Sequence, residues 1–322
     1  MEIINDIPDC SSHRSAAIGT FDGLHRGHRE IIDRTVKWAE ERGVNSSVVT
    51  FEPPPELVLT DQEAVDRRLL TREEKMRTIK DLQVDIVYEI TFDREFASTS
   101  PEEFTDRILS DRLNARAIYV GSNFRFGHQR SGNVSTLKQR LEPEGVEVHP
   151  VEAIEYNGEP VSSTRIRECI RSGEISRANE LLGRQYFVHE RRIRGEGRGR
   201  EIGFPTLNFT LERTIRPKHG VYCVWVGSSQ SLPGVANIGT RPTVDDSEQV
   251  VLEVHMLDEV PEIPPGTRER IFLGPFIRNE RSFESVDELK RQIEQDVQQA
   301  EKTFDELDSP DHIRDSDAMK LC

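Results

Sequence analysis

The sequence predicts an α/β protein in two parts: a Rossmann-like, doubly wound parallel sheet, followed by an antiparallel β-barrel with a terminal helix. Two observations support this prediction. Strand and helix signals alternate up to about residue 184, which is typical of a parallel sheet covered by helices. From residue 186 to about 277 the segments are short, β-rich and interrupted by Gly and Pro, which is typical of an antiparallel barrel or sandwich.

Short runs of β-branched and other apolar residues predict the strands of the first part. They cover residues 15–19, 46–51, 85–90, 117–121 and 146–151. In open parallel sheets, ligands bind at the carboxyl ends of the strands. The segments that directly follow these runs are therefore the first places to look for a site.

Apolar spacing and capping residues predict the helices. Apolar residues at helical spacing indicate a helix over residues 28–42. Capping boxes are expected at two further helix starts, formed by Thr71 with Glu74 and by Ser100 with Glu103.

Three helices are expected in the second half of the chain. Residues 165–183 are typical of a helix pair that joins the two parts. Ser285 is expected to cap the last helix, with Glu288 completing a capping box. The apolar residues of this helix fall at spacings of three and four and predict one buried stripe. They are Val286, Leu289, Ile293, Val297, Ala300 and Phe304.

These patterns predict two domains, over residues 1–184 and 185–307. Residues 308–322 are acidic and aperiodic, so we expect them to form a flexible tail.

The composition excludes several classes of protein. With 43 Lys and Arg against 58 Asp and Glu, the net charge is −15, which disfavours nonspecific binding to nucleic acid or to an anionic membrane. No apolar run approaches the ~20 residues that span a bilayer, and the N-terminus lacks the regions of a secretory signal. The four cysteines form no CxxC pair. We therefore expect a cytoplasmic protein; an oligomer is compatible with the sequence but is not indicated by it.

The segment GTFDGLHRGH, residues 19–28, follows a predicted strand and leads into a helix. Glycines let the backbone approach a phosphate, and a helix N-terminus offers N–H donors. His25 and His28 are three residues apart, so both imidazoles face one side once the helix has begun, where they could stabilise charge on a phosphoryl group. A surface histidine pair or a zinc site is the alternative. The candidate phosphate-binding residues are Gly19, Phe21, Asp22 and Gly23.

The segment VSSTRIR, residues 161–167, places hydroxyl and guanidinium groups at the start of a predicted helix. The hydroxyls can cap the helix or contact an anion, and the arginines can bind phosphates bidentately. Taken alone, a helix cap with solvated arginines is the simpler interpretation. The presence of GTFDGLHRGH in the same chain favours phosphate binding. The candidate residues are Ser162, Ser163, Thr164, Arg165 and Arg167.

The segment GEGRGREIGFPTLNF, residues 195–209, combines Gly and Arg with a predicted strand. No helix is expected after Gly195 and Gly197, so the segment does not fit a dinucleotide-binding fingerprint, which requires one. A Gly-rich turn before a strand instead suits a phosphate cradle, with Gly197 and Gly203 as candidates.

Thr206 and Asn208 alternate with Leu207, so their side chains lie on one face of the strand. A hydroxyl and an amide oxygen are candidate ligands for Mg²⁺ on a nucleotide. Hydrogen bonding along the strand edge is the alternative. Thr206 is also a candidate nucleotide-binding residue.

Several motifs together indicate a family. GTFDGLHRGH and VSSTRIR resemble two signatures of the nucleotidyltransferase superfamily, whose members join a nucleoside monophosphate to an acceptor phosphate and release pyrophosphate. VGSNFRFGHQRSGN, residues 120–133, is similar to a flavin-pocket element of bacterial FAD synthetases. GFPTLN, LPGVANIGTRPTV, LEVHMLD and FIRNERSFESVDELKRQIEQD resemble riboflavin kinases. From residue 18 to about 304, the chain therefore resembles the bifunctional bacterial riboflavin kinase/FAD synthetases.

The resemblance implies a nucleotidyltransferase-type sheet domain, a riboflavin kinase-type barrel, and ATP, riboflavin and FMN as substrates. The first domain would adenylylate FMN to FAD and pyrophosphate, with His25 and His28 as catalytic residues. The barrel would phosphorylate riboflavin with ATP and Mg²⁺, with Glu253 as the base. FMN and FAD would be substrate and product, not prosthetic groups. The implied flavin-binding residues are Asn123, Phe124, Phe126 and Phe204, each Phe being equally compatible with a core position.

Two positions depart from the family pattern. Asn123 stands where many members have Asp, and Pro54 stands where members usually have His. These departures leave open a monofunctional riboflavin kinase with a degenerate N-terminal domain. A nucleotidyltransferase for another acceptor and a non-catalytic flavin-binding protein are further alternatives. The kinase motifs argue against the first of these, and the presence of His25 and Glu253 argues against the second.

Overall fold

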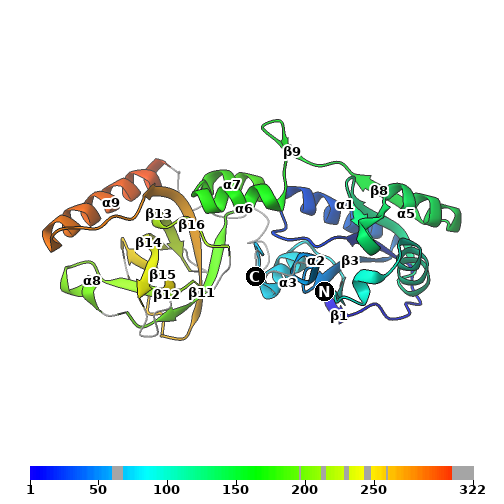
Figure 1. The fold of residues 1–322 in the computed structure, drawn as a ribbon, viewed down its shortest axis with the longest axis horizontal. Helices are drawn as coiled ribbons and strands as arrows, with labels where there is room; N and C mark the ends of the chain where they lie inside the picture. The colour runs from blue at the N-terminus through cyan, green and yellow to red at the C-terminus, as the bar shows by residue number, and fades with distance from the viewer. Residues whose placement is uncertain are drawn as a thin grey trace. The chain divides into compact units, whose positions relative to one another are not determined.

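A computed structural model describes residues 1–59, 68–195, 197–211, 215–227, 232–242, 248–258 and 260–306 of the chain. The expected tail, residues 308–322, lies outside this part. The chain divides into two compact units, Met1–Ser163 and Thr164–Cys322. Each unit is described by itself (Figure 1).

The first unit is built on a six-stranded sheet in the order β1-β4-β3-β2-β5-β8, and all neighbouring strands run parallel (Figure 1). The strands are β1 (Glu2–Asn5), β2 (Arg14–Ile18), β3 (Asn45–Glu52), β4 (Ile86–Thr91), β5 (Ala115–Gly121) and β8 (Glu147–Val151). The predicted parallel sheet is confirmed, with strand ends that differ from the prediction by one or two residues. The edge strand β1 was not predicted, because a run of four residues gives little pattern and its partner β4 is distant in sequence.

Helices and short turns connect these strands. The helices are α1 (Arg26–Arg42), α2 (Pro55–Leu59), α3 (Arg72–Asp81), α4 (Pro101–Glu103), the π-helix η2 (Phe104–Arg112) and α5 (Val134–Leu141). The 3-10 turns are η1 (Phe96–Ser98), η3 (His128–Arg130) and η4 (Glu142–Glu144). Two small ribbons are formed by β6 (Arg125–Phe126) with β7 (Gly132–Asn133), and by β9 (Glu155–Tyr156) with β10 (Glu159–Pro160).

The capping residues behave as expected at one predicted box and only in part at the other. The Thr71 hydroxyl accepts from Glu74 N, and the Glu74 carboxylate accepts from Thr71 N, so the first box is confirmed. The Ser100 hydroxyl accepts from Glu103 N at 3.0 Å, but the Glu103 carboxylate pairs with Arg107 on the next turn. The predicted capping box at Ser100 was therefore wrong in one of its two bonds, because the Glu103 carboxylate does not accept from Ser100 N.

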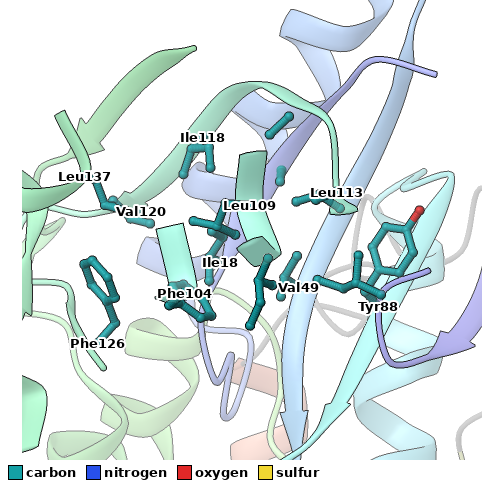
Figure 2. Packing of buried hydrophobic residues seen from close by; sticks show 14 of the residues in the cluster. Ile18, Val49, Tyr88, Phe104, Leu109, Leu113, Ile118, Val120, Phe126 and Leu137 are labelled. Carbon is teal, nitrogen blue, oxygen red and sulfur yellow. The ribbon is translucent and has the colours of Figure 1, made fainter. Parts of the chain in front are cut away.

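The main core of the first unit lies on one face of the sheet (Figure 2). Alternate residues of the strands point into it, as the pleat requires, and η2 and α5 cover it. Its members include Ile18, Val49, Tyr88, Phe104, Leu109, Leu113, Ile118, Val120, Phe126 and Leu137. On the opposite face, the Ser15 hydroxyl of β2 donates to Thr35 O of α1 at 2.8 Å. Helices thus cover both faces, as the doubly wound prediction requires.

The second unit is a closed antiparallel barrel in the order β11-β12-β15-β14-β13-β16. Its strands are β11 (Phe187–Ile193), β12 (Thr206–Thr210), β13 (Gly220–Val226), β14 (Leu232–Pro242), β15 (Glu248–Met256) and β16 (Arg268–Arg278). The predicted barrel is confirmed, and closure of the sheet decides between the barrel and the sandwich.

The expected helix pair is α6 (Ser163–Ser172) and α7 (Ile175–Leu182). Both helices make hydrogen bonds within the second unit: Lys218 N donates to Ile170 O at 3.3 Å, and Tyr186 N donates to Asn179 Oδ1 at 2.7 Å. Both helices therefore pack with the barrel, although they precede residue 184 in the sequence. The domain boundary at residue 184 stays a prediction.

A short helix, α8 (Arg198–Glu201), follows the glycines at 195 and 197. The expectation that no helix follows them was wrong. With four residues, α8 is a single turn between antiparallel barrel strands. It is too short to be the long crossover helix of a dinucleotide-binding unit, which connects parallel strands.

The last helix, α9 (Val286–Glu306), packs on the barrel through only part of its predicted stripe. Ala300 is buried, and Val297 and Phe304 pack against the same cluster, but Val286 is 55% exposed. The Ser285 hydroxyl accepts from Glu288 N as expected, whereas the Glu288 carboxylate accepts from Glu284 N and not from Ser285. The capping box was thus correct in one of its two bonds.

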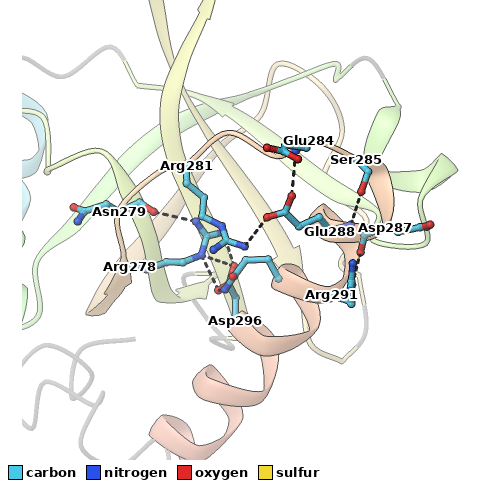
Figure 3. Close-up of polar contacts among 10 residues, drawn as sticks. Arg278, Asn279, Arg281, Glu284, Ser285, Asp287, Glu288, Arg291 and Asp296 are labelled. Atoms are coloured by element: carbon cyan, nitrogen blue, oxygen red, sulfur yellow. Dashed lines mark hydrogen bonds and ion pairs between the residues drawn. The ribbon is translucent and has the colours of Figure 1, made fainter.

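A buried ion pair joins α9 to β16 (Figure 3). The Arg278 guanidinium donates from Nε and Nη2 to the Asp296 carboxylate at 2.8 and 2.7 Å. Asp296 is 4% exposed and also accepts from Gln292 at 2.8 Å. The bidentate geometry satisfies both carboxylate oxygens, which is what a buried charge requires.

We expect Asp296→Ala to lower the free energy of unfolding of the second unit by about 3 kcal/mol, because it leaves a guanidinium partly buried without its carboxylate. The double variant Arg278→Met with Asp296→Leu should regain most of this loss. Urea unfolding measures both, with Arg177→Gln, which removes an exposed pair with Glu174, as a control that costs about 0.5 kcal/mol or less. A loss of similar size in the control would contradict the assignment.

Candidate active sites

A tight turn carries the chain from β2 into α1. Phe21, Gly23 and Leu24 have positive φ angles of 50°, 81° and 42°, in the left-handed region that favours glycine. A Cβ at Gly23 would lie 2.6 Å from Leu69 Cδ1, so only glycine fits there without a shift. The backbone at this strand end is thus constrained into one narrow turn.

Three hydrogen bonds fix this turn to segments that are distant in sequence. The Asp22 carboxylate accepts from Leu69 N at 2.8 Å, and Asp22 O accepts from the Ser163 hydroxyl at 2.8 Å. The Thr50 hydroxyl donates to Thr20 O at 3.3 Å. Asp22 and Ser163 therefore have a positioning role in addition to the phosphate contacts predicted for them.

The turn presents the two histidines as a stacked pair. His25 is the N-cap of α1, which begins at Arg26, two residues before the predicted start. Its Nδ1 accepts from His28 N at 3.4 Å, and the two rings stack with centroids 3.6 Å apart. The ring of Phe21, which is buried, meets His28 edge-on at 5.4 Å. The sequence predicted that both imidazoles share one side, and the structure brings them together.

Burial keeps both imidazoles neutral. It lowers the pKa of His25 to about 4, and burial together with the adjacent His25 lowers the pKa of His28 well below its usual value. Because Nδ1 of a neutral His25 accepts a hydrogen bond, its proton is on Nε2. His28 Nδ1 is buried and has no hydrogen-bond partner in the described part of the chain. The pair can therefore act as hydrogen-bond donors to an anion without carrying charge.

The VSSTRIR residues lie on both sides of the division between the units. Ser162 and Ser163 belong to the first unit, and Ser163 contacts the turn through Asp22 O. Thr164, Arg165 and Arg167 lie at the start of α6, in the second unit. A role for these three beside the histidines stays a prediction.

The segment after β5 turns sharply, with Phe124 N donating to Gly121 O at 2.9 Å. Asn123 is exposed at this turn. Phe124 and Phe126 stack at 5.5 Å, and Phe126, 7% exposed, packs against Phe104 in the core. Phe126 is therefore a core residue, whereas Asn123 and the half-buried Phe124 remain candidates for contact with a ligand.

The barrel unit brings the predicted kinase residues together on neighbouring strands. Asn208 of β12 lies opposite Glu253 of β15, and Asn237 of β14 lies opposite Glu253 on its other side. The Asn208 amide donates to the Thr206 hydroxyl at 3.3 Å, which confirms that both side chains share a face. Glu253 is half-buried.

Glycines allow the Gly-rich segment to approach these residues. A Cβ at Gly195 would lie 2.5 Å from Asn208 Nδ2, so a side chain there would displace the amide. Gly197 and Gly203 have φ angles of 82° and 95°, which glycine alone adopts readily.

Two residues beside this site were not predicted. His255 Nδ1 donates to Pro205 O at 3.0 Å, and its ring meets Phe204 edge-on at 5.3 Å. Asn237 becomes a neighbour of Glu253 only through pairing of β14 with β15. The alternation in LEVH could have placed His255 on the face of Glu253, but no local signal gives the strand pairing of Asn237.

The comparisons with known proteins agree with this geometry. The chain matches the FAD synthetase family over residues 7–165 and the riboflavin kinase family over residues 182–304. The bifunctional riboflavin kinase/FMN adenylyltransferase of Escherichia coli strain K12 is 38% identical over 290 residues, 89% of this chain and 91% of that protein. The protein of the same name from Bacillus subtilis strain 168 is 35% identical over 295 residues, 90% of this chain and 92% of that protein.

A solved structure described as a macrolide-efflux protein from Streptococcus pneumoniae is also similar. It aligns with a TM-score of 0.85 at 30% identity, covering 94% of this chain and 99% of that one. Among the described helices here, none combines the length and the apolar composition needed to cross a membrane. Together, the two family matches in one order and the extent of the similarity show that the chain belongs to the family of bifunctional riboflavin kinase/FMN adenylyltransferases.

Proposed function

We propose that the two units divide two successive reactions between them. The barrel unit phosphorylates riboflavin with ATP to give FMN, and the sheet unit adenylylates FMN with a second ATP to give FAD and pyrophosphate. The observation that carries this proposal is the match of one chain to both enzyme families over most of its length. The monofunctional alternative is not favoured, because the FAD synthetase match spans residues 7–165 and the histidine pair is formed.

In the barrel, Glu253 takes the proton of the riboflavin 5′-hydroxyl as that oxygen attacks the γ-phosphorus of ATP. The bond to the β-phosphate oxygen breaks, and ADP leaves. Asn208 and Asn237 flank Glu253 across the sheet and orient groups around it by hydrogen bonding. Gly197 and Gly203, where a Cβ would meet no other atom, leave room for the phosphates of ATP.

Thr206 and Asn208 fit a magnesium ion that arrives with the nucleotide. They offer neutral oxygens on one face of β12, and Asn208 is almost fully buried. Among the described residues, no group of three or more His, Cys, Asp or Glu side chains could hold a metal by itself. Phosphate and water oxygens would therefore complete the shell, as Mg²⁺ prefers. When bound, the ion offsets negative charge on the phosphates.

In the sheet unit, an oxygen of the FMN phosphate attacks the α-phosphorus of ATP, and pyrophosphate leaves. No side-chain nucleophile is required. The neutral imidazoles of His25 and His28 donate hydrogen bonds to oxygens on which charge grows, while the narrow turn holds them in place. The Ser162 and Ser163 hydroxyls, which belong to the same unit, add further donors to the phosphates.

We expect Glu253→Gln to abolish FMN formation and to leave FAD formation from supplied FMN intact. Gln keeps the shape of the side chain but cannot accept a proton, so kinase turnover should fall about 10²–10⁴-fold. Chromatography of the flavins formed from riboflavin, ATP and Mg²⁺ measures the first step, and incubation with FMN measures the second. A variant that keeps near wild-type kinase turnover would remove Glu253 from its role.

We expect His28→Ala to lower the turnover of FAD synthesis about 10²–10³-fold, or ~3 kcal/mol in barrier, while the KM for ATP changes little. Riboflavin kinase activity should not change. His13→Ala is the matched control, because His13 is exposed at the other end of β2. The assignment fails if the His28 variant makes FAD at the normal rate, or if its turnover loss merely follows a fall in melting temperature.

We expect a fragment that begins at Thr164 to phosphorylate riboflavin without making FAD. A fragment that begins at Tyr186 should do the same with lower stability, because it loses the hydrogen bonds to Ile170 O and Asn179 Oδ1, each worth about 1 kcal/mol. Thermal melting and kinase activity of the two fragments test this. A folded Thr164 fragment without kinase activity would refute the separation of the two reactions.

A further inference from the structure

Lys75, in the first turns of α3, is a buried cation that the proposed chemistry leaves unused. The residue is 5% exposed, and its ammonium donates to Thr50 Oγ1 at 3.2 Å. No carboxylate within the described ranges forms an ion pair with it. An ammonium has three donors, and a buried charge is costly without an opposite charge. Lys75 therefore has room for an anionic partner.

The nearest acidic side chains already have other partners. Arg68 pairs with Glu52 at 3.0 Å, and Arg72 pairs with Glu89 at 2.6 Å. Burial lowers the pKa of Lys75, and the negative charges of Glu52, Glu89 and Asp22 oppose that shift. These carboxylates help to keep the ammonium charged, but Glu52 and Glu89 are held by arginines, and the Asp22 carboxylate accepts from Leu69 N.

Lys75 lines a small cavity of about 10 Å³, which is roughly the room for one water-sized group such as a single phosphate oxygen. The cavity lies at the carboxyl ends of β2 and β3, which is the edge where parallel sheets bind ligands. The other polar residues that line it are Thr20, Asp22, Glu52, Arg68 and Arg72. Thr50, which accepts from Lys75, also donates to Thr20 O in the turn that carries the histidines. The Thr50 hydroxyl therefore links the Lys75 ammonium to the turn that carries the histidines.

We infer that Lys75 binds a phosphate group of a substrate of adenylyl transfer, an inference that rests on the function proposed for the sheet unit. A phosphate oxygen supplies the anionic partner that the described chain does not provide, and hydrogen bonds between two charged groups are the strong ones. Two substrates carry such a group: FMN has a phosphate monoester, and ATP has a triphosphate. Lys75 is a binding residue and transfers no proton.

The test compares Lys75→Met, Lys75→Arg and the control Lys80→Met in the full chain. Met keeps the apolar stem but removes the charge, Arg keeps the charge, and Lys80 is an exposed lysine of the same helix. The measurements are the KM for FMN, the KM for ATP and the turnover of FAD synthesis. Riboflavin kinase activity and melting temperature are measured on the same preparations.

We expect Lys75→Met to raise the KM for one substrate about 10–100-fold, as for loss of a hydrogen bond between charged groups. A rise for FMN identifies the monoester, and a rise for ATP identifies the triphosphate. Lys75→Arg should regain part of the affinity, and Lys80→Met should match the wild type. The inference is overturned if both KM values stay normal in Lys75→Met, or if they rise only together with a fall in melting temperature. A wild-type chain that makes no FAD would instead refute the proposed function.

Discussion

The hydrogen bonds of Asp22 are the constraint on which the sheet unit's site depends. Its carboxylate holds Leu69 N, and its carbonyl holds the Ser163 hydroxyl, so one residue ties the turn after β2 to two distant segments. This tie keeps Phe21 and Leu24 in a left-handed backbone that they would not adopt alone. This turn determines where α1 begins, and the start of α1 places His25 and His28 in their stacked positions.

In the barrel unit, strand pairing holds the candidate site residues in place. A closed barrel has no free edge, so the register of β12, β15 and β14 fixes Asn208, Glu253 and Asn237 side by side. The Gly-rich segment then approaches Asn208 more closely than any other residue type would allow. In this unit the long-range constraint is the sheet itself, whereas in the first unit it is a small set of side-chain hydrogen bonds.

Positive side chains gather at one cavity of the sheet unit, although the chain as a whole is acidic. The chain has a net charge of −15, yet two of the proposed substrates, ATP and FMN, are anions. Arg68, Arg72 and Lys75 meet at one cavity beside the histidine turn. Arg68 and Arg72 form ion pairs with Glu52 and Glu89, whereas Lys75 is buried and has little contact with solvent. A low-dielectric wall strengthens the attraction of such a cation for an anion. The histidines beside it stay neutral, so they donate hydrogen bonds without adding a charge that would need its own partner.

The sequence by itself determined the features that are encoded locally. These are the alternating strands and helices, the capping box at Thr71, the barrel pattern and the motifs that indicate the family. Tertiary structure alone decided which distant residues meet. Only the folded chain shows that residues 2–5 form the edge strand β1 and that Phe126 lies in the core. It also shows that α9 contacts β16 through the Asp296 ion pair in addition to apolar residues, and that Lys75 is buried. The physical reason is that periodicity reports neighbours within one helix turn or strand pleat. Burial and hydrogen bonding of a polar side chain depend instead on residues dozens of positions away, which only the folded chain brings into contact.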